Sequence, residues 1–159
     1  MTCEFCELVE YDNEYFIGET KCWKIYLAND QNYPGRCIIP LKTHRNNLSE
    51  LTPEEFADMQ SVVNILESIS RKVFGATNFN WTCLMNGGYA TTPPNPHVHL
   101  HFIPRYKEPF KTRNGDFVDE TFGTHYILKG NFERDLQDRH DWAAALKLEF
   151  FAYMKEDKI

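Results

Sequence analysis

The chain has 159 residues, of which 42% are hydrophobic and 25% charged, and it carries a formal net charge of −6 at pH 7. This length suits one domain with a substantial core, and the acidic balance argues against nonspecific binding to nucleic-acid polymers. No apolar run reaches the length of a membrane span, residues 1–6 do not resemble a signal peptide, and five cysteines are an odd number for a disulfide framework. We therefore expect residues 1–159 to form a single domain of a cytoplasmic protein that binds no membrane.

The first half of the chain predicts two strands followed by one long helix. Residues 23–27 alternate in the manner of a strand, and residues 29–35 are rich in the Asn, Asp, Pro and Gly of turns. Residues 36–41 are nearly all apolar at their centre and predict a second strand. The helix is expected to begin at residues 52–55, where Thr-Pro-Glu-Glu supplies an N-cap, a first-turn proline and a capping-box glutamate. Its apolar residues follow helical spacing up to Gly75, a plausible stop.

The second half predicts two more strands and a final helix. Residues 79–85 alternate as a third strand, residues 86–88 turn the chain, and residues 91–96 form a stiff, proline-rich linker. A strand at residues 97–105 follows that linker. The segment 106–138 is polar and loop-like, and apolar residues at i, i+4 spacing predict a helix over residues 141–154. Strands in sequence with inserted helices indicate an α+β fold with a mainly antiparallel sheet.

The strand expected over residues 97–105 reads His-Val-His-Leu-His-Phe-Ile-Pro-Arg. Three of the chain's six histidines lie in its first five residues. Alternate side chains of a strand point to the same face, so His97, His99 and His101 should line one side while the residues between them cover the other. A hydrophobic core has no use for three imidazoles on one face. A nucleophile, a metal ion or an anion-binding site does.

This run closely resembles the histidine triad (HIT) motif, His-x-His-x-His followed by two apolar residues. Its surroundings are similar to that family as well: Pro34-Gly35, Lys42-Thr43-His44, the Thr-Pro-Glu-Glu helix start, Asn86-Gly87 and Pro104-Arg105. The resemblance implies a HIT-like α+β fold, with a mainly antiparallel five-stranded sheet, one long helix and a C-terminal helix, commonly paired into homodimers. It covers a core of about residues 3–106 and leaves residues 107–159 as a C-terminal extension of the same domain.

The resemblance also implies an activity. Members of the family are nucleotide hydrolases and nucleotidyl transferases that attack the α-phosphate of a nucleotide or dinucleoside polyphosphate, cleaving a phosphoanhydride or phosphoramidate bond. The middle histidine, here His99, is implied to be the nucleophile, with a nucleotidyl-histidine intermediate that water then attacks. Imidazole suits this role because its usual pKa of about 6.5 leaves it mostly neutral at pH 7. His101 is a candidate for orienting the reacting groups or for donating a hydrogen bond to the phosphate.

Candidate substrate-binding residues also follow from the resemblance. Asn86, Gly87 and Gly88 occupy the positions of the family's phosphate pocket, where glycine lets backbone N–H groups approach phosphate oxygens. Asn29 resembles a ribose-contacting position. One departure concerns the leaving group: many members carry a polar residue just before the triad, where this chain has Pro93.

Zinc is the one cofactor indicated. Cys3 and Cys6 form a Cys-x-x-Cys spacing. Some histidine triad proteins, and the related galactose-phosphate uridylyltransferases, complete such a pair with two histidines, which correspond here to His44 and His97. Two thiolates and two neutral imidazoles would make a closed, uncharged, structural tetrahedral site. A competing role for His97 is contact with the leaving group.

Two other functions remain open at this stage. The three triad histidines could hold the metal of a metal-dependent hydrolase, although the next carboxylate downstream of the triad is Glu108. The chain could also be a nucleotide-binding scaffold with little turnover, which Pro93 favours.

Overall fold

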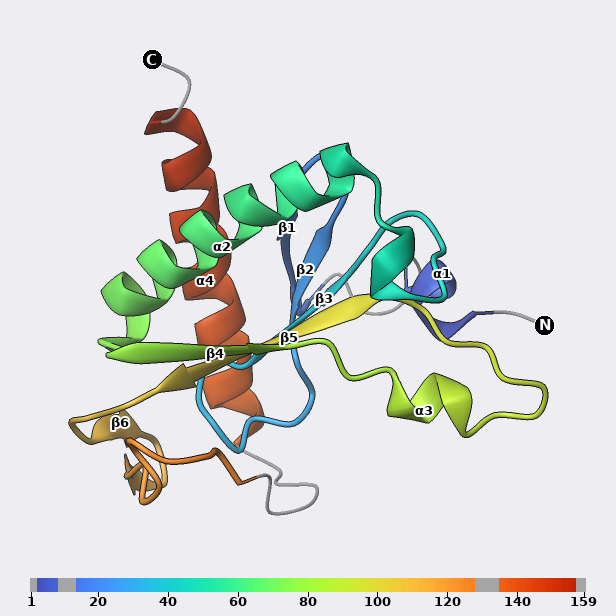
Figure 1. Cartoon of the computed structure of the whole chain (residues 1–159). Coiled ribbons are helices and arrows are strands. Elements are labelled where there is room, and N and C mark those ends of the chain that lie inside the picture. The colour runs from blue at the N-terminus through green and yellow to red at the C-terminus, as the bar shows by residue number, and fades with distance from the viewer. Residues whose placement is uncertain (1–2, 9–13, 128–134, 157–159) are drawn as a thin grey trace.

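The computed structural model describes residues 3–8, 14–127 and 135–156 (Figure 1). Their helices are α1 (Glu4–Glu7), α2 (Pro53–Phe74), α3 (Asn86–Tyr89) and α4 (Leu136–Glu156), with a 3₁₀ turn at Leu48–Glu50. The strands are β1 (Phe16–Glu19), β2 (Lys24–Leu27), β3 (Cys37–Pro40), β4 (Asn78–Thr82), β5 (His99–Arg105), β6 (Phe110–Thr112) and β7 (Gly115–Phe117). No helix in these segments combines the length and apolar character needed to cross a bilayer.

Five strands form one antiparallel sheet in the order β1-β2-β3-β5-β4, and β6 and β7 form a separate hairpin. The predicted α+β fold is confirmed. α1 and α3 both lie at the end of the sheet where β5 begins, although they are far apart in the sequence (Figure 1). The first residue of β5 at this end of the sheet is His99, the middle histidine of the triad.

The long helix α2 forms where its local signals predict. The Thr52 hydroxyl accepts a hydrogen bond from the Glu55 amide at 3.2 Å, and the Glu55 carboxylate accepts one from the Thr52 amide at 2.7 Å. At the other end, Gly75 adopts a left-handed φ of 66° and its amide donates to the Arg71 carbonyl. Both helix ends therefore satisfy backbone groups that would otherwise lack partners.

The two faces of β5 have different surroundings. Leu100 and Phe102 are buried in the core with the apolar stripe of α2, as the alternation predicts, and so is Val98, which precedes the strand. On the other face, register aligns His101 with Ile38 of β3 and with Thr82 of β4. Because directly opposed residues share a face, these side chains form a row across the sheet.

Several elements differ from the sequence expectation. Strand β1 is not predicted, because Gly18 interrupts the strand pattern. A Cβ at Gly18 would lie 2.3 Å from Phe150 of α4, so close packing excludes a side chain there. The loop expected over 106–138 is wrong at residues 110–117, which form the β6–β7 hairpin, while residues 128–134 lie outside the described part. The turn at 86–88 is part of the short helix α3, and α4 is longer than predicted.

Candidate active site

The middle histidine has one ring nitrogen committed and one available. His99 is buried, and its Nδ1 lies 2.7 Å from the backbone oxygen of His97. A carbonyl oxygen only accepts hydrogen bonds, so Nδ1 carries the proton and Nε2 keeps its lone pair. Burial lowers the pKa of His99, against the opposing effect of that hydrogen bond, so the neutral imidazole is favoured at pH 7. The geometry is that of a nitrogen nucleophile.

The third histidine faces a different partner. The ring of His101 lies 4.9 Å from that of His99 and nearly perpendicular to it. Its Nδ1 is 3.4 Å from Nη2 of Arg36, the residue that precedes β3. Burial, followed by the neighbouring His99 and Arg36, lowers the pKa of His101 to about 4.

The first histidine turns toward the N-terminus. Ligand atoms of Cys3, Cys6, His44 and His97 all lie within 4.8 Å of one another. His97 Nδ1 is 3.2 Å from the sulfur of Cys3 and 3.6 Å from that of Cys6, and His44 Nδ1 is 3.4 Å from the Cys6 sulfur. All four residues of the predicted zinc set are therefore brought together, although they come from segments before and after β3.

The donor set fits zinc. Ligands at zinc distances of about 2.0 to 2.3 Å in a tetrahedron lie roughly 3.3 to 3.8 Å from one another, close to the separations found here. His97 Nε2 lies 2.7 Å from the Leu41 carbonyl and His44 Nε2 lies 3.2 Å from the Asn46 amide oxygen. Such acceptors place the ring proton on Nε2 and leave Nδ1 of both rings free to bind a metal.

A catalytic metal held by the three triad histidines has no such support. Within residues 3–8, 14–127 and 135–156, the Cys3, Cys6, His44 and His97 cluster is the one group of three or more potential ligands found close together. The Nδ1 atoms of the triad instead face sulfur, a carbonyl and a guanidinium.

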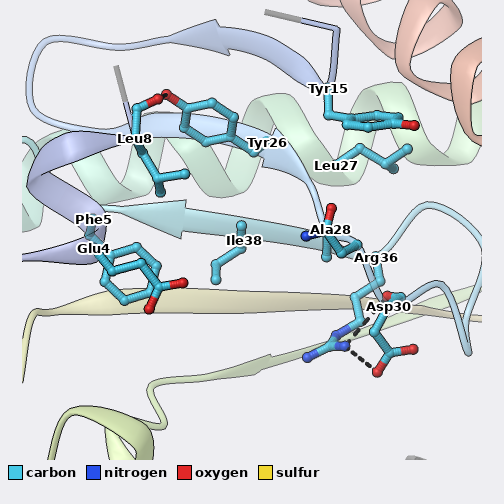
Figure 2. Close-up of a pocket in the computed structure, with 11 residues that line it drawn as sticks. Glu4, Phe5, Leu8, Tyr15, Tyr26, Leu27, Ala28, Asp30, Arg36 and Ile38 are labelled. Atoms are coloured by element: carbon cyan, nitrogen blue, oxygen red, sulfur yellow. Dashed lines mark hydrogen bonds and ion pairs between the residues drawn. The ribbon is translucent and has the colours of Figure 1, made fainter. Parts of the chain in front are cut away.

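Phe5 of α1 lies over the nucleophile. Its ring stacks on that of His99 with centroids 4.3 Å apart and an interplanar angle of 28°. Two cavities meet at this ring. The Arg36 cavity, of about 290 Å³, is lined by Glu4, Phe5, Leu8, Tyr15, Tyr26, Leu27, Ala28, Asn29, Asp30, Arg36 and Ile38. The His99 cavity, of about 230 Å³, is lined by Cys3, Glu4, Phe5, Met85, Gly87, Gly88, Thr91, Asn95, His97 and His99. Figure 2 shows the first of these, with α1 on one side and the Arg36–Asp30 pair on the other.

The predicted substrate-binding residues fall on both cavities. Asn29 lines the Arg36 cavity, and its side-chain oxygen accepts a hydrogen bond from Arg139 of α4 at 3.1 Å. Gly87 and Gly88 line the His99 cavity, whereas Asn86, the first residue of α3, does not. A Cβ on Gly88 would lie 2.5 Å from the Cα of Pro96, so only glycine fits between α3 and the proline-rich linker.

Pro93 does not line the His99 cavity, but the polar side chain of Thr91, two residues before it, does. The Thr91 hydroxyl donates to the carbonyls of Gly88 at 2.8 Å and Pro93 at 3.0 Å.

Phe5, Asp30 and Arg36 also line this site, although none of them is predicted from the sequence. Asp30 Oδ2 lies 2.6 Å from Arg36 Nη1, and both line the cavity beside the triad. Arg36 adjoins the apolar strand in the sequence, but its burial, which shows that its charge must be paired, appears only in the structure. No local signal shows that the strand brings it to His101.

The sequence comparison agrees with this geometry. A family profile described as the HIT domain matches residues 11–108, more than half of the chain. The chain belongs to the HIT domain family.

Curated relatives of this HIT protein include two enzymes by name. Adenylylsulfatase HINT3 of Arabidopsis thaliana is 31% identical over 133 residues, 79% of this chain and 60% of that protein. Adenosine 5′-monophosphoramidase hnt1 of Schizosaccharomyces pombe is 29% identical over 111 residues, which are 69% of this chain and 79% of that protein. The HIT chain thus spans less than two thirds of the length of HINT3.

Solved structures share the fold. A hypothetical histidine triad nucleotide-binding protein from Sulfolobus tokodaii superposes with a TM-score of 0.69 and 16% identity over 94% of this chain and 93% of that one. A zinc-bound histidine triad family protein from Mycobacterium smegmatis gives a TM-score of 0.67 and 24% identity over 98% of both chains.

Proposed function

We propose that this HIT protein is a hydrolase that cleaves a leaving group from the α-phosphate of a nucleotide through a nucleotidyl-histidine intermediate on His99. One observation carries the proposal. His99 Nδ1 lies 2.7 Å from the His97 carbonyl oxygen and donates its proton to it, which leaves Nε2 as a neutral nucleophile beside a cavity. The names of the relatives, an adenylylsulfatase and a phosphoramidase, support this substrate class.

The proposed reaction has two displacement steps at the α-phosphorus. His99 Nε2 donates its electron pair to the α-phosphorus, and the bond from phosphorus to the leaving nitrogen or oxygen breaks with its electrons on the leaving group. A leaving nitrogen takes up one proton from solvent as it departs, which the proton lost by the attacking water in the second step balances. The imidazole then carries a positive charge, which the His97 carbonyl stabilises through the Nδ1 proton. Water next attacks the same phosphorus, the bond from phosphorus to Nε2 breaks, and a nucleoside monophosphate is released with neutral His99 restored.

The two cavities support a division of the substrate. In the proposed arrangement the nucleoside occupies the Arg36 cavity, where Tyr26 and Ile38 offer apolar surface and Asn29 and Asp30 offer hydrogen bonds to a ribose. The leaving group occupies the His99 cavity, beside Gly87, Gly88 and Thr91. The α-phosphate would lie between them, at the edge of Phe5.

Intact-protein mass spectrometry and turnover assays test the proposal. The protein is incubated with adenosine 5′-phosphoramidate, adenylylsulfate or diadenosine tetraphosphate and quenched in acid, and its intact mass is measured. We expect an adenylyl adduct and AMP release, both lost in His99→Gln with a fall in turnover of roughly 10³-fold or more. His125→Gln, an exposed histidine outside both cavities, is the matched control. Full activity of His99→Gln on every nucleotide would refute the proposal.

A nucleotide-binding scaffold is the second candidate, and Pro93 at the usual polar position favours it. The same experiment separates the two functions. Tight AMP binding by the wild type with neither adduct nor turnover supports the scaffold, whereas an adduct that accumulates supports slow hydrolysis.

We also propose that Cys3, Cys6, His44 and His97 hold a structural zinc ion. Zinc would supply a fixed connection between α1 and the sheet, with no part in the bond-breaking steps. The fit of the four donors supports this proposal, and so does the zinc-bound relative from Mycobacterium smegmatis. A homodimer and a cytoplasmic location stay predictions from the family resemblance and the cysteine content.

A further inference from the structure

Arg36 is a buried cation in a rigid setting. Only 9% of the residue is exposed, and its backbone is fixed because its amide donates to the Tyr33 carbonyl while its carbonyl accepts from the Ala28 amide. Nη1 pairs with the Asp30 carboxylate at 2.6 Å (Figure 2). Nε is buried without a hydrogen-bond partner among the described residues, so the contacts that hold the guanidinium are those of Nη1 and Nη2.

The guanidinium also contacts His101, through its Nη2 atom. Guanidinium groups donate hydrogen bonds and accept none. Nη2 of Arg36 lies 3.4 Å from His101 Nδ1, so this nitrogen must present a lone pair and the proton of the neutral ring must be on Nε2. Asp30 holds the guanidinium from the far side, because Nη1 and Nη2 have separate partners.

We propose that Arg36 is a positioning residue that fixes His101 as its Nε2–H tautomer, which makes the third triad imidazole a hydrogen-bond donor in the site. A ring free to exchange tautomers would present a lone pair for part of the time and would repel a phosphate oxygen. The consequence for turnover rests on the proposed function; the tautomer itself does not.

The charged surroundings agree with a neutral ring. The titratable groups that act on His101 are His99 on its own strand and Arg36 from the start of β3, and both disfavour a second positive charge. The Asp30 carboxylate is already paired with the guanidinium, and Glu4 of α1 lines the same cavity. Burial, His99 and Arg36 lower the pKa of His101, against the opposing effect of the Leu84 backbone carbonyl, and keep the ring unprotonated at neutral pH.

Nitrogen-15 NMR of histidine-labelled protein tests the tautomer without substrate. We expect the wild-type His101 signal, assigned by its loss in His101→Gln, to show a protonated Nε2 and a bare Nδ1 from pH 6 to 8. Arg36→Met keeps an unbranched stem without the guanidinium and should give a mixture of tautomers and a raised pKa of His101. Arg71→Met, an exposed arginine of α2, should leave the His101 signal unchanged. A wild-type ring protonated at Nδ1 would overturn the proposal even if Arg36→Met did not fold.

Turnover of adenosine 5′-phosphoramidate provides a second readout. Since losing one preorganised donor costs about 10²- to 10³-fold in kcat, disordering that donor should cost roughly tenfold, mainly in kcat rather than KM. If no variant or wild-type protein turns over any nucleotide, the proposed function fails while the NMR result still decides the role of Arg36. Unchanged kcat in Arg36→Met with a mixed tautomer would refute the functional consequence.

Discussion

Three imidazoles two positions apart have three different chemical environments in this protein. Their Nδ1 atoms face cysteine sulfur at His97, a backbone carbonyl at His99 and a guanidinium at His101. The strand repeat places His99 and His101 on one face of β5, whereas His97 precedes the strand, and each partner comes from a different part of the chain. Residue type and spacing therefore predict that the cluster has a chemical role, while the partners decide which nitrogen of each ring is available.

The neutral state of His101 makes the protein sensitive to acid. In the folded chain its pKa is about 4, whereas a histidine of the unfolded chain has a pKa of about 6.5. Between these values the unfolded chain binds a proton that the folded chain does not, so the free energy of unfolding falls as the pH drops from 6.5 toward 4. Urea unfolding from pH 7 to 5 should show this fall, and it should be shallower in His101→Gln.

The exposed His125 provides the control for that experiment. His125→Gln, which removes a histidine outside both cavities, is measured in parallel. Equal slopes for the wild type and His101→Gln would show that the third triad ring takes up its proton as readily in the folded state as in the unfolded one.

Among the elements, those set by local interactions are the ones that sequence predicts. The α2 boundaries follow from Thr52, Glu55 and Gly75, which all act within one turn of the helix ends. Strand β1 depends on Gly18 packing against a helix more than a hundred residues away, so no neighbouring residue signals it. The same reason explains the site: the triad is local, whereas the approach of Arg36 depends on the pairing of β3 with β5.

Helix α1 offers the clearest test of the zinc proposal. Four residues make a helix too short to be stable alone, so its position over His99 needs an anchor. Cys3 precedes α1 and Cys6 lies within it, and both sulfurs face His97. Native mass spectrometry of protein produced with zinc should find one zinc ion per chain, and hydrogen exchange across residues 3–8 should rise when a chelator removes it.

Cys6→Ser should lose the zinc ion, because serine is a poor ligand for zinc. Cys22→Ser, which changes a cysteine outside the cluster, should keep it. Zinc content that is the same in Cys6→Ser and in the wild type, or absent from both, would contradict the proposed site.

The whole chain is proposed to be one folding unit, with residues 107–159 as an extension of the HIT core. Helix α4 packs on both α2 and β1, and Trp142 and Leu146 are part of the same buried cluster as the sheet. Arg139 of α4 also reaches Asn29 at the rim of the Arg36 cavity. The extension thus supports the edge of the sheet and one wall of the proposed nucleoside site.

Phe150 and Phe151 of α4 test this unity as a matched pair. Phe150 is buried against Gly18 of β1, whereas Phe151 is 49% exposed. Phe150→Ala removes a core ring and should lower the free energy of unfolding by about 3 to 5 kcal/mol, while Phe151→Ala should change it by roughly 0.5 kcal/mol or less. Far-UV circular dichroism and tryptophan fluorescence should report one urea transition that shifts as a whole in Phe150→Ala. If α4 were a separate unit, the sheet would keep its wild-type midpoint and the helix would unfold in an earlier step of its own.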